Sequence, residues 1–162
     1  MKNKAIYLSA AVCLLAVLGM ILSLILTGGN GKQATFTPPP FEAEAQSGTP
    51  TVADESWTRL FQDGMNFSAH LCGKVVLSGK SADVYFANDE ENEVWLKLRI
   101  LDEKDHILAE TGLVKPNEYV RTVTFNPVPA DGTKIKMKIM AYEPDTYYSA
   151  GAVTLSTTVG GG

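Results

Sequence analysis

Hydrophobic and polar residues alternate along two stretches of the chain. In residues 94–101 (VWLKLRIL) and 134–141 (KIKMKIMA) nearly every second residue is apolar, and the residues between are mostly basic or aromatic. A period of two places alternate side chains on opposite faces of a β-strand. Each stretch therefore predicts a strand with one buried face and one largely polar face.

Further segments have the composition of strands and are separated by turns. Gly, Pro, Asn and Asp cluster between them, as turn formation requires. About seven short strands at near-regular spacing predict an all-β fold, an antiparallel immunoglobulin-like sandwich. The five additional predicted strands are residues 75–77, 82–87, 107–110, 119–125 and 152–158.

The stretch before these strands has a different pattern. Trp57, Leu60 and Phe61 have the i, i+3, i+4 spacing of a single helical turn. Residues 68–71 after them have the pattern of an extended segment. We expect one helical turn here, ahead of the sheets.

Residues 5–26 form an uncharged, mostly apolar run. As a helix this run is about 33 Å long, close to the thickness of the hydrocarbon core of a bilayer. Lys2 and Lys4 precede it, which places the N-terminus in the cytoplasm and the rest of the chain outside the cell. A cleaved secretory signal is the alternative, but the run is long for one and ends in a poor cleavage site.

The chain is therefore expected to have four parts. Residues 1–27 are a signal-anchor transmembrane helix, and residues 28–55, rich in Gly and Pro, are a flexible linker. Residues 56–158 are the β-sandwich domain, long enough for its own core. Residues 159–162 are a disordered tail. The protein is expected at the cell membrane, single-pass, with its C-terminal domain extracytoplasmic.

The charge balance argues against one class of binding partner, the polyanions. The whole chain has 14 basic and 18 acidic residues, a net charge of −4, and the part beyond Lys2 and Lys4 is more acidic still. Binding of nucleic acid or anionic lipid depends on clustered basic charge. We therefore expect no nucleic-acid partner.

The chain offers little catalytic chemistry. His70 and His106 are its only histidines, and Cys72 is the only cysteine outside the apolar run. No metalloprotease, hydrolase or paired-cysteine motif occurs. Cys72 is either a small buried hydrophobic residue or the site of an intermolecular disulfide. We expect a protein that is not an enzyme and needs no cofactor.

An acidic segment is the best candidate for a metal site. Asp89, Glu90 and Glu91 follow one another in a loop between two predicted strands. Calcium takes six to eight oxygen ligands, which such loops supply in extracellular sandwiches. The spacing of an EF-hand is missing, so a solvated turn is the competing interpretation.

Aromatic residues are the candidate for ligand binding. Tyr142, Tyr147 and Tyr148 flank a turn, and Trp95 faces the more polar side of its strand. Tyrosine-rich loops suit the recognition of peptides and sugars, since their rings bury area at a low entropy cost. The alternative is that these rings brace one end of the sandwich.

Four segments of the C-terminal half share a pattern with a group of known proteins. These segments are residues 82–88, 92–98, 112–119 and 149–155. The pattern resembles small membrane-anchored extracytoplasmic β-sandwich proteins of Gram-positive, Clostridia-type bacteria, some of them carried on conjugative elements. The resemblance implies a fold and a location but no activity. The chain departs from the pattern at Asp89, where proline is common, and at Asn117, where glycine is common.

The sequence thus predicts a non-enzymatic β-sandwich tethered to the membrane by its N-terminal helix. Its predicted role is to make contacts with another protein of the cell envelope, as an accessory of a conjugation or secretion apparatus. The alternative is a module that binds glycans or small ligands through Trp95 and the tyrosines of residues 142–148.

Overall fold

The two alternating stretches form the two central strands of one antiparallel sheet. Trp95–Leu101 is β6 and Lys134–Tyr142 is β9, and the two pair along their length, from Trp95 opposite Tyr142 to Leu101 opposite Lys136. This four-stranded sheet has the order β10-β9-β6-β7. The alternation predicts the buried face correctly: Leu98, Ile139 and Met137 have no exposed surface.

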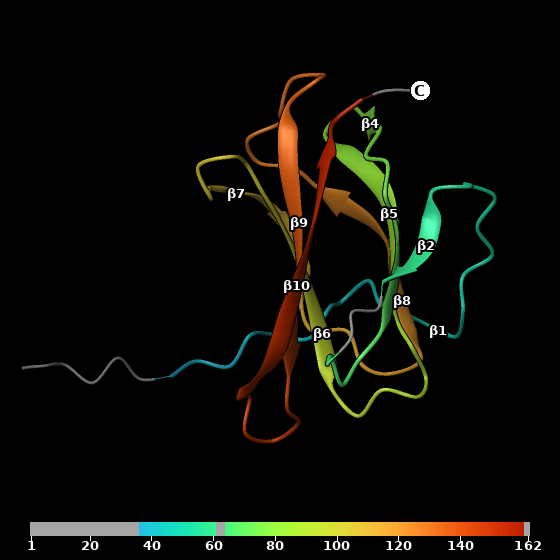
Figure 1. The fold of residues 1–162 in the computed structure, drawn as a ribbon, viewed down its shortest axis with the longest axis vertical. Helices are drawn as coiled ribbons and strands as arrows, with labels where there is room; N and C mark the ends of the chain where they lie inside the picture. The colour runs from blue at the N-terminus through green and yellow to red at the C-terminus, as the bar shows by residue number, and fades with distance from the viewer. Residues whose placement is uncertain (1–35, 61–63, 161–162) are drawn as a thin grey trace, which may run out of the picture. The chain divides into compact units, whose positions relative to one another are not determined.

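The computed structural model describes residues 36–60 and 64–160 (Figure 1). In them the chain is all-β, with two antiparallel sheets, and the second sheet has six strands in the order β1-β8-β5-β3-β2, with β4 paired to β5. The strands not yet given are β1 (Gln46–Ser47), β2 (Trp57–Leu60), β3 (Ala69–Cys72), β4 (Leu77–Ser78), β5 (Ser81–Asn88), β7 (Ile107–Glu110), β8 (Glu118–Thr124) and β10 (Ser149–Thr158).

One hydrophobic core lies between the two sheets. Figure 1 shows them as two layers, with β9 and β6 in one and β5 and β8 in the other. Leu71, Val84 and Phe86 of the six-stranded sheet belong to the same buried cluster as the inward side chains of β6 and β9. Burial of such side chains contributes about 1.5–3 kcal/mol each. Cys72 is also buried and free, as expected for a small hydrophobic residue.

Residues 40–48 run along the edges of both sheets, and we call them the N-terminal strap. Their main chain pairs first with Leu113, which donates to Pro40 O and accepts from Glu42 N, both at 2.9 Å. Leu113 lies beside Val114, which pairs with β6. The strap then forms β1, which pairs with the start of β8. A single segment therefore pairs with the edges of both sheets, at Leu113 and at the first two residues of β8.

The strap lies in the segment that was expected to be a linker. The compact unit that holds the sheets begins at Pro38, whereas the sequence predicts that the β-sandwich domain begins at residue 56. The strap has no alternation of its own, because β1 is two residues long and both of its residues are exposed. Its pairing depends on the main chain, which carries no sequence signature.

Three other expectations differ from the structure. Residues 57–60 form β2, not a helical turn, because β3 supplies main-chain partners along the whole segment. The described residues hold ten strands instead of about seven. β1 and β2 are too short and exposed to show a pattern, and β3 was expected only as an extended segment at residues 68–71. Val159, expected in a disordered tail, is buried and forms a bridge with Val75.

The predicted membrane span, residues 5–26, lies outside the described residues. Within residues 36–60 and 64–160 no helix has the length and hydrophobicity needed to cross a membrane.

A substitution at Gly112, which the strap approaches closely, tests whether the strap stabilises the domain. A Cβ atom added at Gly112 would lie 2.5 Å from Glu42 N, so Gly112→Ala must displace the strap. We expect the free energy of unfolding to fall by about 1–3 kcal/mol, and proteolysis before Gln46 to become faster. Chemical denaturation and limited proteolysis measure both effects.

Gly73→Ala is the matched control. The nearest atom to its added Cβ is Ser56 O at 3.6 Å, an ordinary contact. If the two variants unfold and are cleaved alike, the strap does not contribute to the stability of the domain.

Candidate functional sites

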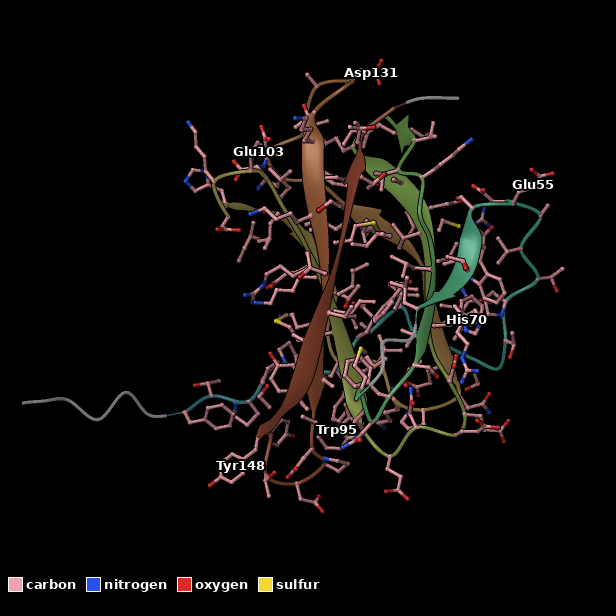
Figure 2. The ribbon with its side chains drawn as sticks, viewed as in Figure 1. Glu55, His70, Trp95, Glu103, Asp131 and Tyr148 are labelled. Carbon is pink, nitrogen blue, oxygen red and sulfur yellow. The ribbon has the colours of Figure 1, made fainter. Side chains whose placement is uncertain are left out.

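The predicted aromatic residues lie at one end of the four-stranded sheet. Trp95 and Tyr142 are directly opposite each other in β6 and β9. The ring of Trp95 contacts two other aromatic rings. Its centroid lies 4.8 Å from that of Phe41, in the strap, and 5.2 Å from that of Tyr147. Tyr148 is 72% exposed, and Figure 2 shows it at the same end of the domain as Trp95. The structure brings all four together.

The contacts of Trp95 favour the bracing interpretation. Its ring packs on Phe41 in an edge-to-face arrangement, and Lys115 Nζ lies 4.6 Å from the centroid of the Phe41 ring. Aromatic pairs and cation–π contacts of this kind stabilise a fold by about 0.5–1.5 kcal/mol each. The cluster fixes the strap to β6. Ligand binding by these four residues stays a prediction.

In the acidic segment the three carboxylates have different surroundings. Asp89 accepts hydrogen bonds from Arg59 Nε at 3.2 Å and His70 Nδ1 at 2.7 Å, and also from Ser68 Oγ. Because an ionised carboxylate only accepts, Nδ1 is the protonated ring nitrogen of His70. Glu90 and Glu91 are exposed on the turn.

These contacts bear on the calcium hypothesis. Both oxygens of Asp89 already have protein donors. Across the part of the chain that the structure describes, no group of three or more His, Cys, Asp or Glu side chains is placed to hold a metal ion. Calcium binding by Asp89, Glu90 and Glu91 stays a prediction, and the geometry favours a structural role for Asp89.

Ser68, His70 and Asp89 have the residue types of a catalytic triad but not its geometry. In a triad the imidazole lies between the serine and the carboxylate and takes the proton of the serine. Here Ser68 Oγ donates to Asp89 directly, and its side chain is buried. His70 bonds to the other oxygen of the same carboxylate. The arrangement does not activate Ser68 as a nucleophile.

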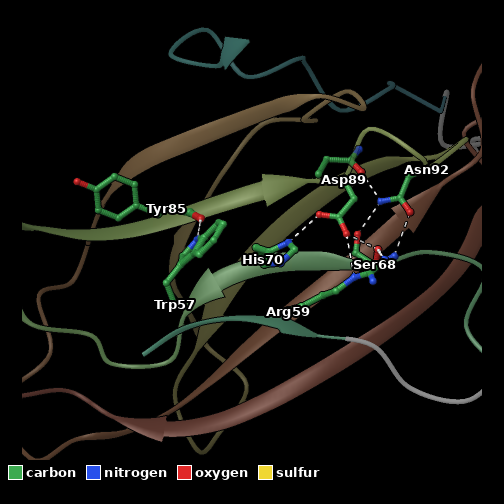
Figure 3. A network of polar contacts seen from close by, with 8 residues as sticks. Trp57, Arg59, Ser68, His70, Tyr85, Asp89 and Asn92 are labelled. Atoms are coloured by element: carbon green, nitrogen blue, oxygen red, sulfur yellow. Dashed lines mark hydrogen bonds and ion pairs between the residues drawn. The ribbon is translucent and has the colours of Figure 1, made fainter. Parts of the chain in front are cut away.

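Two buried asparagines extend this network towards the four-stranded sheet (Figure 3). Asn92 donates to Ser68 O and to Asn88 Oδ1, both at 2.6 Å, and accepts from Ser68 N at 3.0 Å. Asn88 donates to the carbonyls of Val94 and Val114, both at 2.9 Å. Buried amides are tolerated only when they are satisfied in this way. The network therefore determines the conformation of the turn that joins β5 to β6.

A cleft of about 290 Å³ opens beside the network. Trp57 and His70 stack at its wall, with ring centroids 4.6 Å apart and planes inclined by 23°. Arg59, Glu90, Glu91 and Asn117 also line the cleft. It combines an aromatic surface with groups of both charges, which suits a small polar ligand. The sequence indicated the acidic side of the cleft, as a candidate metal site at residues 89–91, but not its aromatic wall, since Trp57 was expected on a helical turn.

A strained residue lies next to this wall. Tyr85 has a φ of +42°, at a β-bulge between Asp83 and Phe86 where β5 pairs with β8. A bulky residue in this region costs about 1–3 kcal/mol. Trp57 Nε1 donates to Tyr85 O at 3.0 Å, so the indole is bonded to the carbonyl of the strained residue.

The outer face of the four-stranded sheet is basic, with partly matched charges. Lys97 and Arg99 form ion pairs with Glu110. Lys97 Nζ lies 3.1 Å and Arg99 Nη2 lies 2.9 Å from Glu110 Oε2. Burial acts to raise the pKa of Glu110, but the hydrogen bonds and charges of Lys97 and Arg99 outweigh it and lower the pKa below its usual value. On β9, Lys136 pairs with Asp105 at 2.6 Å. Lys138 has no ion pair with any described residue.

Strand β10 forms an edge of this sheet. In the described residues it pairs with β9 alone, and none of its ten residues is buried. It contains no charged residue and no proline. A hollow of about 400 Å³ lies beside its C-terminal half, lined by Ser156 and Thr158 of β10 and by Lys134, Lys136 and Glu103.

The sequence predicted a strand at residues 152–158, but it could not show that this strand is an edge. Edge position is a property of the topology, which places β9 on one side of β10 and no described strand on the other.

Comparison with known proteins adds no assignment. No family model matches the chain, and neither a curated protein nor a solved structure matches it.

The structural role of Asp89 predicts the effect of neutralising it. Asp89→Asn removes a charge that Arg59, Ser68 and His70 all contact, and hydrogen bonds to charged groups contribute about 1.5–3 kcal/mol. We expect a loss of stability of that size, measured by chemical denaturation at neutral pH. Glu91→Gln, two residues further along, is the matched control and should change stability little. Equal stability of the two variants would contradict the role given to Asp89.

Proposed function

We propose that this chain is a single-pass membrane protein whose extracytoplasmic immunoglobulin-like β-sandwich makes protein–protein contacts in the cell envelope. In this proposal it is an accessory of a conjugation or secretion apparatus, without catalytic activity. The apolar run at residues 5–26 supports the membrane attachment. The resemblance of the C-terminal half to anchored proteins of Gram-positive bacteria supports the setting.

The observation that carries the contact role is the open edge of β10. Natural proteins protect such edges with charges, prolines, bulges or short strands, because unpaired main-chain groups recruit other chains. The other edges of the two sheets are short, or are partly covered and charged. β2 and β7 have four residues each. The strap pairs with Leu113 and with the first two residues of β8, and the rest of β8 includes Arg121. Strand β10 has ten residues, and its pairing irregularity lies only at its start, between Ser149 and Gly151. Addition of a partner strand at such an edge is a common mode of recognition.

Site-specific photo-crosslinking in native membranes tests this role. A photo-reactive amino acid in place of Thr154 on β10 should form a covalent adduct with another envelope protein. The same amino acid in place of Val128, which is 42% exposed in a loop, is the control and should form none. An absence of adducts at Thr154, in protein that fractionates with the membrane, would contradict the proposal.

A second candidate function is the binding of a glycan or other small polar ligand. The cleft lined by Trp57, Arg59 and His70 favours it, because strained residues such as Tyr85 cluster at functional sites. This candidate differs from binding at Trp95, whose ring is already packed between Phe41 and Tyr147.

Tryptophan fluorescence distinguishes the two locations. Titration with cell-wall fragments should change the emission of a Trp95→Phe variant, which retains Trp57, and leave that of a Trp57→Phe variant unchanged. The reverse result would place the ligand at the aromatic end, and a flat response in both variants would remove this candidate.

A further inference from the structure

We infer that the partner segment recognised by β10 is an extended acidic strand, which adds beside residues 154–156, before the point where Val75 meets the chain, and places carboxylates near the lysines of β9. This inference rests on the proposed contact role of β10 and names the chemistry of its partner.

Main-chain pairing is the first part of the recognition. In an antiparallel pair, alternate residues direct their N–H and C=O groups away from the neighbouring strand. Along the C-terminal half of β10, Thr154, Ser156 and Thr158 are exposed, and no charged or proline side chain hinders an added strand. In the part of the chain described by the structure, β9 is the only strand paired with β10, and Val75 meets the chain where β10 ends, through its bridge with Val159 and the hydrogen bond that Gly160 N donates to Val75 O at 2.8 Å. An incoming segment can therefore continue the sheet.

Charge is the second part. The exposed residues of β10 are opposite lysines of β9: Thr154 opposite Lys138, Ser156 opposite Lys136, and Thr158 opposite Lys134. An added strand would lie about 9–10 Å from β9, twice the spacing of neighbouring strands. Lysine side chains can extend over the small Ser and Thr side chains and meet carboxylates on that strand.

Two of these lysines have weak ion pairs, or none, with described residues, so carboxylates of a partner can pair with them. Lys134 Nζ lies 3.9 Å from Glu103 Oε1, and both side chains are about 70% exposed. The ion pair between them is therefore weak. Lys138 has no ion pair with a described residue. The hollow of about 400 Å³ between Lys134, Lys136 and the hydroxyls of β10 offers space for an acidic side chain.

The same charges argue against a second copy as the occupant. Strand β10 contains no carboxylate, so pairing of two β10 strands would bring Ser and Thr beside each lysine row and leave Lys138 unmatched. An acidic segment matches the lysine row as well as the main chain.

A binding assay with the full chain in lipid nanodiscs tests the inference. The probe is a fluorescent peptide of about ten residues in which valine alternates with glutamate, capped at both ends, and fluorescence anisotropy measures its affinity. We expect saturable binding that weakens as salt is added. Two matched peptides should each bind at least tenfold more weakly: one has lysine in place of glutamate, and the other has N-methyl groups on alternate amides.

Two variants locate the binding. Lys138→Glu should lower the affinity for the acidic peptide about two- to fivefold, the range for an exposed ion pair. Lys80→Glu makes the same change of charge in the turn between β4 and β5 and should leave the affinity unchanged.

Other results would overturn the inference. These are equal affinity for the acidic and basic peptides, no effect of N-methylation, no binding of any peptide, or a dimer of the full chain whose spin labels at Thr154 lie side by side. If photo-crosslinking at Thr154 still captures an envelope protein, the contact role of β10 survives and only the acidic chemistry of the partner is wrong. If both experiments fail, the contact role fails as well.

Discussion

The architecture depends on how the main-chain hydrogen bonds at the sheet edges are satisfied. A sheet that ends in an unpaired strand exposes a row of donors and acceptors, and two sheets have four such edges. In this protein the strap provides main-chain partners at Leu113 and at the start of β8, one in each sheet. The same strap places Phe41 against Trp95, so side-chain packing and edge pairing hold it in one position. The uncovered edge of β10 stands out because it has ten residues, whereas β7 at the opposite edge of the same sheet has four.

A second constraint acts on the turn between β5 and β6. This turn leads the chain from the six-stranded to the four-stranded sheet, and Asn88 and Asn92 tie it to its surroundings by donating to the carbonyls of Val94, Val114 and Ser68. Asp89 continues the network to Arg59 and His70 at the surface, where the stacked ring of Trp57 completes the wall of the cleft. The residues that make this crossing rigid are therefore also the residues that shape the cleft. A ligand bound there would meet a wall with little freedom to move.

The parts of the fold that alternate were predictable from the sequence, and the parts held by the main chain were not. Residues 94–101 and 134–141 have one apolar face each, and that face is the buried one. The strap has no such face, and its glycine, proline and acidic residues are typical of a linker. Asp89 was recognised as a possible site residue, but its partners Arg59 and His70 come from β2 and β3, distant in sequence. Trp95 was placed on the correct face of its strand, yet the strap residue that covers it could not be foreseen.

Amide hydrogen exchange tests the central claim, that β10 is an edge left open for a partner. The full chain would be compared as purified protein and in native membranes. The account predicts that alternate amides of residues 154–156 exchange fast in the purified protein and become protected in the membrane, while the strap amides, already paired to Leu113 and β8, stay protected in both. Equal exchange of the β10 amides in the two preparations would contradict it.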